Sequence, residues 1–348
     1  MIFTNLDADE FTKFEQKQPN GNFFQSTARA DLRRKMGFHT YLVGVKEKSK
    51  ILAAALIVER YLEAWIQIGP ILDYDNLKLL DFFLTEVKHF AKSQGFYKLE
   101  IFPPVVLSTR NQDGSDIERF DRDAIFQAFA KHGFTHEGFT TEVENKANRW
   151  MFIKDLTGIK NLREAELTMN SSTRKKLHKT QRELDIHILT DKKELKEWLH
   201  ALEDSDLRNG VKTRNVKYFE DLWDSFGDQA IFVEARRKDT GELVSSEVDI
   251  FHPNEMVAFV AGTVEHNKHF NGSTAIKGWN IEECLRRGYT RLNLYGMKGI
   301  FTPDNPLLFF KAGLGGYTEE YIGGFCLVLN QRKLFCNKVR RRLKLPVK

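Results

Sequence analysis

The fold of this chain is decided by a stretch that occurs twice. It reads Gly95-Phe96-Tyr97-Lys98-Leu99-Glu100-Ile101-Phe102 in the first copy and Gly288-Tyr289-Thr290-Arg291-Leu292-Asn293-Leu294-Tyr295 in the second. The glycine that opens each copy lies 26 positions after another glycine, Gly69 or Gly262. An aromatic-x-Lys-x-Gly segment follows each copy, at residues 129–133 and 309–313. Similar stretches in the same order indicate an internal duplication, so we expect two α/β domains of like topology.

Hydrophobic periodicity predicts the elements of each copy. Apolar residues recur at 79, 80, 83, 84, 87, 90 and 91, which predicts a helix over residues 77–94. Asp75 or Asn76 can cap its start, and Gly95 can adopt the left-handed conformation just past its end. The matching helix of the second copy is expected from about residue 274 to 287. Strands are predicted at residues 51–57, 65–69, 98–102, 243–250, 259–263 and 291–295.

Length and hydropathy place the chain among two-domain globular proteins. Its 348 residues exceed what one hydrophobic core usually serves. We expect residues 1–150 together with 322–348 to form the first domain, and residues 151–321 to form the second. The longest aliphatic run, Ile51 to Val58, is far shorter than the ~20 residues that span a bilayer. The short length of this run excludes a membrane-spanning protein, and we expect a cytoplasmic one.

Cysteine usage indicates neither disulfides nor a metal site. Cys284, Cys326 and Cys336 are odd in number, widely spaced and form no C-x-x-C motif. They are interpreted as buried, reduced thiols of a cytosolic protein. No His, Cys or acidic spacing matches a set of metal ligands, so we expect no metal.

Positive charge is concentrated in two short segments. Residues 331–348 carry eight basic and no acidic residues, although the whole chain has a net charge of only +5. Such a tail suggests a polyanionic partner or an anionic membrane surface, and a merely solvated tail is the alternative. The second cluster lies in a helical stretch that opens at residue 171, where Lys175, Lys179 and Arg182 are spaced to share one helix face.

The repeat unit resembles the GNAT type of N-acyltransferase, which holds an acyl donor beside an amine in a splayed sheet. The usual coenzyme A signature at a helix start, Gln/Arg-x-x-Gly-x-Gly/Ala, is absent from both copies. Residues 266–273 do not fit it, and residues 73–76 carry carboxylates that would repel a pyrophosphate. The unit therefore suggests acyl transfer to nitrogen from a donor other than coenzyme A.

Several short motifs lie in a consistent order over nearly the full length of the chain. They include Phe3-Thr4-Asn5-Leu6-Asp7, Gly69-Pro70-Ile71-Leu72-Asp73-Tyr74-Asp75, Ala261-Gly262-Thr263, Phe310-Lys311 and Glu320-Tyr321-Ile322-Gly323. With these motifs the chain resembles the Fem aminoacyltransferases of peptidoglycan bridge formation. The resemblance implies two tandem GNAT-like domains and transfer of Gly, Ala or Ser from aminoacyl-tRNA to an amine of a peptidoglycan precursor. That precursor is either UDP-linked or lipid-linked, and no cofactor is expected.

The resemblance also implies the site residues. The family's Phe-Lys pair falls on Phe310 and Lys311, where the lysine stabilises negative charge at the reacting centre. A structural alternative stays open, because Lys131 occupies the parallel place in the first copy. No general base stands out, because Glu100, Asp249 and the substrate's own groups are all possible.

Three further residues are implied to bind the precursor. Arg214 and Tyr218 match a family pair that grips phosphates, and their spacing would place them on one helix face. An ordinary surface arginine beside a half-buried tyrosine is the alternative. A nucleotide-binding lysine of the family falls on Arg33, and the family's tyrosines before Ala261 and after the first domain's third strand are missing. These departures weaken the case for a soluble precursor and leave a lipid-linked one as a competitor.

The long coiled-coil arm of several family members has no room before residue 243. Contact with tRNA is therefore expected on Arg174, Lys175, Lys179 and Arg182, together with the basic tail, which could equally contact the inner face of the membrane. Two other functions stay open: a coenzyme A-dependent N-acyltransferase, and a non-catalytic protein that binds tRNA or a cell-wall precursor.

Overall fold

The computed structural model describes residues 1–143, 146–302 and 305–342. The chain divides into two compact units. The first comprises Met1–Ser108, Glu118–Arg149 and Glu320–Lys348, and the second comprises Thr109–Ile117 and Trp150–Glu319. Every helix among the described residues is too short or too polar to cross a bilayer.

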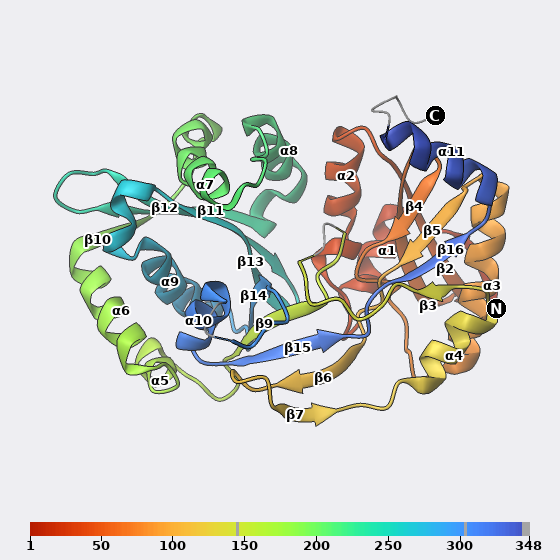
Figure 1. Ribbon diagram of the computed structural model, residues 1–348, viewed down its shortest axis with the longest axis horizontal. Helices are drawn as coiled ribbons and strands as arrows, with labels where there is room; N and C mark the ends of the chain where they lie inside the picture. The colour runs from red at the N-terminus through yellow and green to blue at the C-terminus, as the bar shows by residue number, and fades with distance from the viewer. Residues whose placement is uncertain (144–145, 303–304, 343–348) are drawn as a thin grey trace. The chain divides into compact units, whose positions relative to one another are not determined.

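The first unit is built on a seven-stranded sheet with the order β1-β2-β3-β4-β5-β16-β8 (Figure 1). Strands β4 and β5 are parallel, and the other neighbours are antiparallel. Its core includes Leu80, Phe83 and Val87 of helix α3. The strands are β1 (Ile2–Asn5), β2 (His39–Glu47), β3 (Lys50–Arg60), β4 (Glu63–Ile66), β5 (Lys98–Ile101), β8 (Thr135–His136) and β16 (Phe325–Val328). The helices are α1 (Ala8–Glu15), η1 (Phe23–Gln25), α2 (Thr27–Lys35), α3 (Leu77–Ser93), α4 (Asp123–Lys131) and α11 (Gln331–Arg342).

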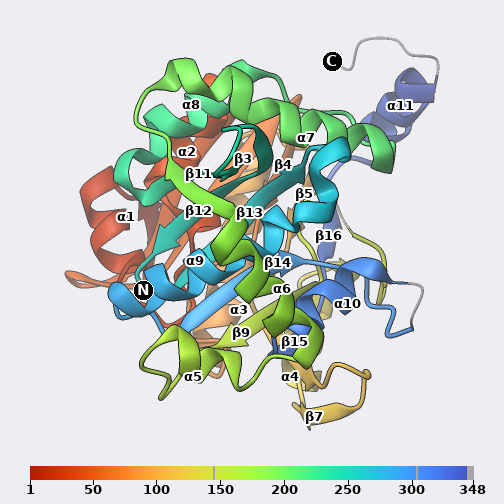
Figure 2. The ribbon, with the colours of Figure 1, turned by 90° about the vertical axis from the view of Figure 1, so that its left-hand side faces the viewer.

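The second sheet has nine strands with the order β10-β11-β12-β13-β14-β9-β15-β6-β7. Helices α7 and α8 cover one face of strands β11 to β13, and α9 covers the other (Figures 1 and 2). The strands are β6 (Val106–Arg110), β7 (Asp116–Arg119), β9 (Trp150–Asp155), β10 (Leu184–Ile188), β11 (Ala230–Arg237), β12 (Leu243–His252), β13 (Glu255–Thr263), β14 (Arg291–Gly296) and β15 (Tyr317–Tyr321). The helices are α5 (Leu162–Glu166), α6 (Ser171–Glu183), η2 (Lys192–Glu194), α7 (Leu195–Asn209), α8 (Val216–Phe226), η3 (Gly227–Gln229), η4 (Glu265–Phe270), α9 (Gly272–Arg286) and α10 (Pro306–Gly313).

The repeat predicted from the sequence is confirmed in its elements. The order β3-β4-α3-β5-α4 of the first unit returns as β12-β13-α9-β14-α10 in the second. Asn76 caps α3 by accepting a hydrogen bond from the Leu79 N–H, and Gly95 follows with φ +71°. In each sheet the final strand of the repeat pairs with a strand from outside the repeat. In the first sheet β5 neighbours β16, and in the second sheet β14 neighbours β9.

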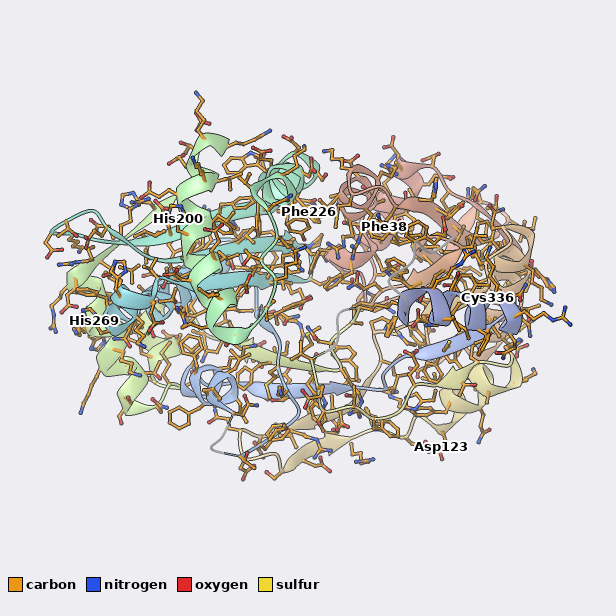
Figure 3. The ribbon with its side chains drawn as sticks, turned by 45° about the horizontal axis from the view of Figure 1, so that its top comes forward. Phe38, Asp123, His200, Phe226, His269 and Cys336 are labelled. Atoms are coloured by element: carbon orange, nitrogen blue, oxygen red, sulfur yellow. The ribbon has the colours of Figure 1, made fainter. Side chains whose placement is uncertain are left out.

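The expected burial of all three cysteines is wrong for two of them. Cys284 is buried, Cys326 is half-buried, and Cys336 is exposed on α11 (Figure 3). All three are free thiols. The error arises because Cys336 lies in a strongly basic helix, and such a helix keeps much of its surface in water.

Candidate active site

A cavity lies in the second unit where the parallel strands β13 and β14 stop pairing. These strands pair at only two positions, Met256 with Leu292 and Val257 with Asn293. Beyond them Tyr295 adopts a left-handed conformation with φ +66°, and the pairing of β14 with β9 shifts register. The cavity measures about 340 Å³, and we call it the reaction cavity. Its walls include residues 261–263 of β13, residues 294–296 of β14 and one face of α10.

Lys311 lies in this cavity and is almost fully buried. Asn305 caps the start of α10 by accepting from the Leu308 N–H, and Pro306 occupies its first position, where no N–H is needed. The Lys311 side chain follows five residues later, and the residue is 5% exposed. Its Nζ donates hydrogen bonds to the backbone oxygens of Tyr295 (3.0 Å) and Gly296 (2.8 Å). Phe310 lines the same cavity.

Burial makes the Lys311 amine unusual. Loss of hydration disfavours the ammonium form, and the nearby Lys277 cation adds repulsion, so the pKa of Lys311 falls to about 7. An amine with such a pKa is present in both protonation states near neutral pH. It can therefore donate a hydrogen bond or a proton, and it can also accept one.

The parallel lysine of the first unit lies in a different environment. Lys131 ends α4, its side chain is 67% exposed, and its Nζ lies 2.7 Å from the Asp81 carboxylate. The aromatic-x-Lys-x-Gly segment thus ends a helix in both units, but its lysine is exposed in the first unit and buried in the second. The burial of Lys311 is not a requirement of the repeat.

A buried charge network contributes to the same cavity. Lys277 of α9 forms an ion pair with Glu247 of β12, and both side chains are buried. The Asn280 Nδ2 donates to Glu247 Oε1 (2.6 Å) and to Asp249 Oδ1 (3.2 Å). Burial and the neighbouring Glu247 charge raise the pKa of Asp249 well above its ordinary value. This shift disfavours ionised Asp249, and Glu247 is the carboxylate that pairs with Lys277.

Sequence reasoning missed Lys277 and Glu247 as site residues. The available signal was the pair of acids at alternate positions of the predicted strand, Glu247 and Asp249. Alternate strand residues share a face, so two carboxylates facing a helix require a cation opposite them. Among the described residues no group of His, Cys, Asp or Glu is placed to hold a metal ion.

Arg214 and Tyr218 contact each other, but not as two residues of one helix. Asn215 is the N-cap of α8, so Arg214 precedes the helix and the expected helix-face argument is wrong. The Arg214 guanidinium nevertheless lies over the Tyr218 ring, 4.8 Å from its centre. Tyr218 is buried and packs against Phe219, whereas Arg214 is exposed.

The other predicted residues lie on two separate helices. Arg33 of α2, in the first unit, is half-buried and donates to Gln67 Oε1 (3.4 Å). Four basic residues lie on α6 in the second unit, where Lys175 and Arg182 are exposed. There Arg174 donates to the Glu166 backbone oxygen (3.5 Å) and Lys179 pairs with Glu183 (3.6 Å). Neither the α6 residues nor the Arg214–Tyr218 pair lines the reaction cavity.

No long coiled-coil arm is present between β10 and β11. That segment forms α7, of 15 residues, and α8, of 11 residues. The expected absence of the arm is therefore confirmed for these residues, all of which the structure describes.

Comparison with known proteins connects this geometry to a family. The sequence pattern of the FemAB family matches residues 6–237 and 232–338. The chain is 23% identical over 419 residues to aminoacyltransferase FemB of Staphylococcus epidermidis, an alignment that covers 99% of this chain and 100% of that protein. The crystal structure of FemX matches with a TM-score of 0.82 at 17% identity, covering 97% of this chain and 99% of that one.

A second solved structure also matches the fold of this chain. A tandem GNAT protein from the clavulanic acid biosynthesis pathway matches with a TM-score of 0.54 at 10% identity, covering 94% of this chain and 98% of that one. At such identities the two structures show the fold, which confirms the predicted mixed α/β class with tandem GNAT-like domains. Because the family pattern spans nearly the whole sequence, the chain belongs to the FemAB family of aminoacyltransferases.

Proposed function

We propose that this chain transfers Gly, Ala or Ser from aminoacyl-tRNA to an amine of a peptidoglycan stem peptide or bridge, in the cytoplasm. Membership of the FemAB family supports the reaction class. The observation that supports a role for a particular residue is the burial of Lys311 in the reaction cavity. The matching lysine of the first unit, Lys131, is exposed and ion-paired, so the repeat itself does not require this burial.

The reaction is aminolysis of an ester. The acceptor nitrogen attacks the ester carbonyl and forms a C–N bond, and the C–O bond to the tRNA ribose then breaks. The nitrogen loses a proton and the ribose oxygen gains one, so no further reactant is needed. Because the ester is already activated, no covalent enzyme intermediate is required.

Lys311 has two roles in this proposal. In the ammonium form two N–H groups bond the Tyr295 and Gly296 oxygens, and the third stabilises the oxyanion of the tetrahedral intermediate. In a water-poor cavity such a donor typically contributes ~10²–10³ in rate. Its pKa near 7 also suits proton transfer to the departing ribose oxygen. Lys277 adds a second positive charge to the cavity, which Glu247 holds in place.

The precursor's phosphates are assigned to Arg214 and Tyr218 of the second unit, and Arg33 of the first unit is a separate candidate contact with the precursor. The exposed Arg214 guanidinium stacks on the Tyr218 ring, and this contact restricts its orientation for a phosphate. Acceptors with a UDP or a lipid carrier both present such phosphates. The basic tail would bring the protein to the inner face of the membrane if the carrier is a lipid.

Incubation with charged tRNAs and both precursor types, followed by mass spectrometry, tests the proposal. A mass gain of one aminoacyl residue identifies the donor and the acceptor together. We expect Lys311→Met to lower the rate at least ~10²-fold, and the matched variant Lys131→Met to leave it unchanged. Product formed from acetyl-coenzyme A instead, or binding of both substrates without transfer, would favour one of the two alternative functions.

A further inference from the structure

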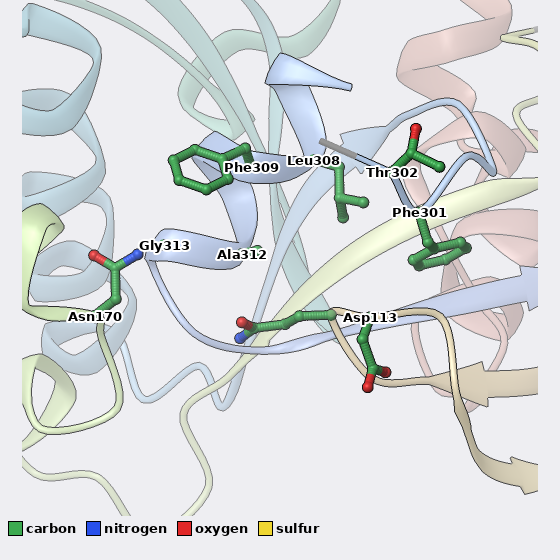
Figure 4. A pocket seen from close by; sticks show the side chains of 9 residues that line it. Asp113, Asn170, Phe301, Thr302, Leu308, Phe309, Ala312 and Gly313 are labelled. Carbon is green, nitrogen blue, oxygen red and sulfur yellow. The ribbon is translucent and has the colours of Figure 1, made fainter. Parts of the chain in front are cut away.

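A second pocket lies on the opposite face of α10 from Lys311. Leu307, Phe310 and Lys311 face the reaction cavity, whereas Leu308, Phe309 and Ala312 face this second pocket. These sets alternate as the three- and four-residue spacing of a helix requires. The second pocket measures about 360 Å³, within the ~300–1,000 Å³ of small-ligand sites. We call it the Phe309 pocket (Figure 4).

Apolar and aromatic side chains form one part of the Phe309 pocket. Phe309 itself is 70% exposed, so its ring presents a free face to a ligand. Phe301 and Leu308 also line the pocket, and Leu308 is buried. An exposed phenylalanine alone is ordinary. Here it borders a hollow, where a flat ring could lie on it.

Polar groups that suit the edge of a nucleobase form the rest of the pocket. Gln112 and Asp113 come from the loop between β6 and β7, which faces α10 across the pocket (Figure 4). Ser115 donates two hydrogen bonds to Asp113, and these keep the pKa of Asp113 below its ordinary value, so the carboxylate is an acceptor only. The Asn170 Nδ2 has no hydrogen-bond partner among the described residues and is a free donor.

The pocket also adjoins the basic helix α6. The Asn170 N–H donates to the Gly313 backbone oxygen (3.0 Å), which joins the end of α10 to the start of α6. Gly313 permits this approach, because a Cβ there would lie 2.4 Å from Thr173 Oγ1. From this junction α6 carries five basic residues and one acidic residue, with Lys175 and Arg182 exposed. A polyanion that enters the Phe309 pocket can therefore continue along a positive surface.

We propose that the Phe309 pocket binds a base of the unpaired 3′ end of the charged tRNA, stacked on Phe309 and read at its edge by Gln112, Asp113 and Asn170. This inference rests on the proposed function. Single-stranded RNA is generally recognised by stacking of splayed bases on aromatic side chains. The α10 helix separates the pocket from Lys311 by ~10–12 Å of helix diameter. Stacked nucleotides advance ~3.4 Å each, so about three terminal nucleotides span that distance.

Binding of a short single-stranded RNA that ends in ACCA, measured by fluorescence anisotropy with the full chain, tests the assignment. Loss of one stacked base weakens binding roughly 5- to 150-fold, so Phe309→Ala should raise the Kd by that factor. Phe309→Trp should keep the Kd within about threefold, since tryptophan also stacks. Phe139→Ala is the matched control, because Phe139 is also an exposed phenylalanine, at 57%, but belongs to the first unit and lies outside the pocket lining and both basic segments.

An abasic RNA separates stacking from general loss of structure. Removing the stacked base should weaken binding to the wild type and leave binding to Phe309→Ala unchanged. In transfer assays Phe309→Ala should raise the KM for aminoacyl-tRNA and leave the KM for the precursor unchanged.

Failure of this inference is distinguishable from failure of the proposed function. If the wild type transfers amino acids while Phe309→Ala binds RNA as tightly as the wild type, the inference is overturned and the function stands. An equal loss in Phe139→Ala would also overturn it. A wild type that transfers no amino acid from any charged tRNA would refute the function itself.

Discussion

Replacing Lys311 by methionine should remove a pH dependence from the stability of the second unit. Methionine has a similar length but carries no titrating group. Burial and Lys277 lower the pKa of Lys311 from its ordinary value of 10.5 to about 7, and Glu247 offsets part of that effect. Between these two values the folded protein holds a neutral amine, whereas the unfolded chain holds an ammonium group. Unfolding in this window therefore takes up one proton.

The sign and the size of the effect follow from that proton. Uptake on unfolding makes the free energy of unfolding rise with pH from about 7 to about 10. Below pH 7 the amine is protonated in both states, and the cost of burying the ammonium, roughly 5 kcal/mol, opposes folding in full. Between pH 6 and pH 9 roughly 2–3 kcal/mol of this cost is relieved. In Lys311→Met this rise of the free energy of unfolding with pH should be absent.

Urea unfolding at pH 6, 7.5 and 9, at constant ionic strength, measures the effect. Tryptophan fluorescence reports mainly on the second unit, which contains Trp150, Trp198, Trp223 and Trp279. The contributions of other titrating groups to the free energy of unfolding cancel when a variant is compared with the wild type at each pH. Lys131→Met should follow the wild type across the range, because its amine is exposed. If the Lys311→Met curve also runs parallel to the wild type, the lysine keeps an ordinary pKa and the reasoning from burial fails.

Three other substitutions test separate parts of the structure. Lys277→Met should lower the free energy of unfolding by ~3–5 kcal/mol in chemical denaturation, because Glu247 is left buried without its cation. Adding Glu247→Gln should recover part of the loss, and no recovery would mean that the unpaired charge is not the cause. Gly262→Ala should cost ~1–3 kcal/mol by the same measurement, since its Cβ would lie 2.3 Å from the Ala201 backbone oxygen, and an unchanged midpoint would contradict the close approach. Lys175→Ala should reduce the slope of log Kd for tRNA against log salt by ~0.7–0.9, and an unaltered slope would show that Lys175 contacts no phosphate.

Local features of the fold were predictable because they depend on near neighbours in the chain. The apolar spacing of residues 79–91 determines which face of α3 is buried, and Asn76 and Gly95 mark its ends. The start of α8 could also have been found, since Asn215 is a strong N-cap residue and would have excluded Arg214 from the helix. The exposure of Cys336 had a weaker signal, the absence of acidic residues from α11.

The candidate site was predictable only in part. The family resemblance pointed to Lys311 and Phe310, and both line the reaction cavity. It did not point to Lys277, whose partner Glu247 lies 30 positions away. Nor did it indicate the Phe309 pocket, because Gln112, Asn170 and Phe309 come together only when the loop between β6 and β7 faces α10.

By itself the sequence determined the repeat, its helices and strands, and the lysine that each copy carries before a glycine. Only the tertiary structure decided that Lys311 is buried against two backbone carbonyls while Lys131 is exposed beside Asp81. The physical reason is that spacing along the chain sets hydrophobic periodicity and helix ends, which are local. Burial, and the pKa that follows from it, depends on groups brought from distant elements, such as Tyr295 at the end of β14 and Lys277 on α9.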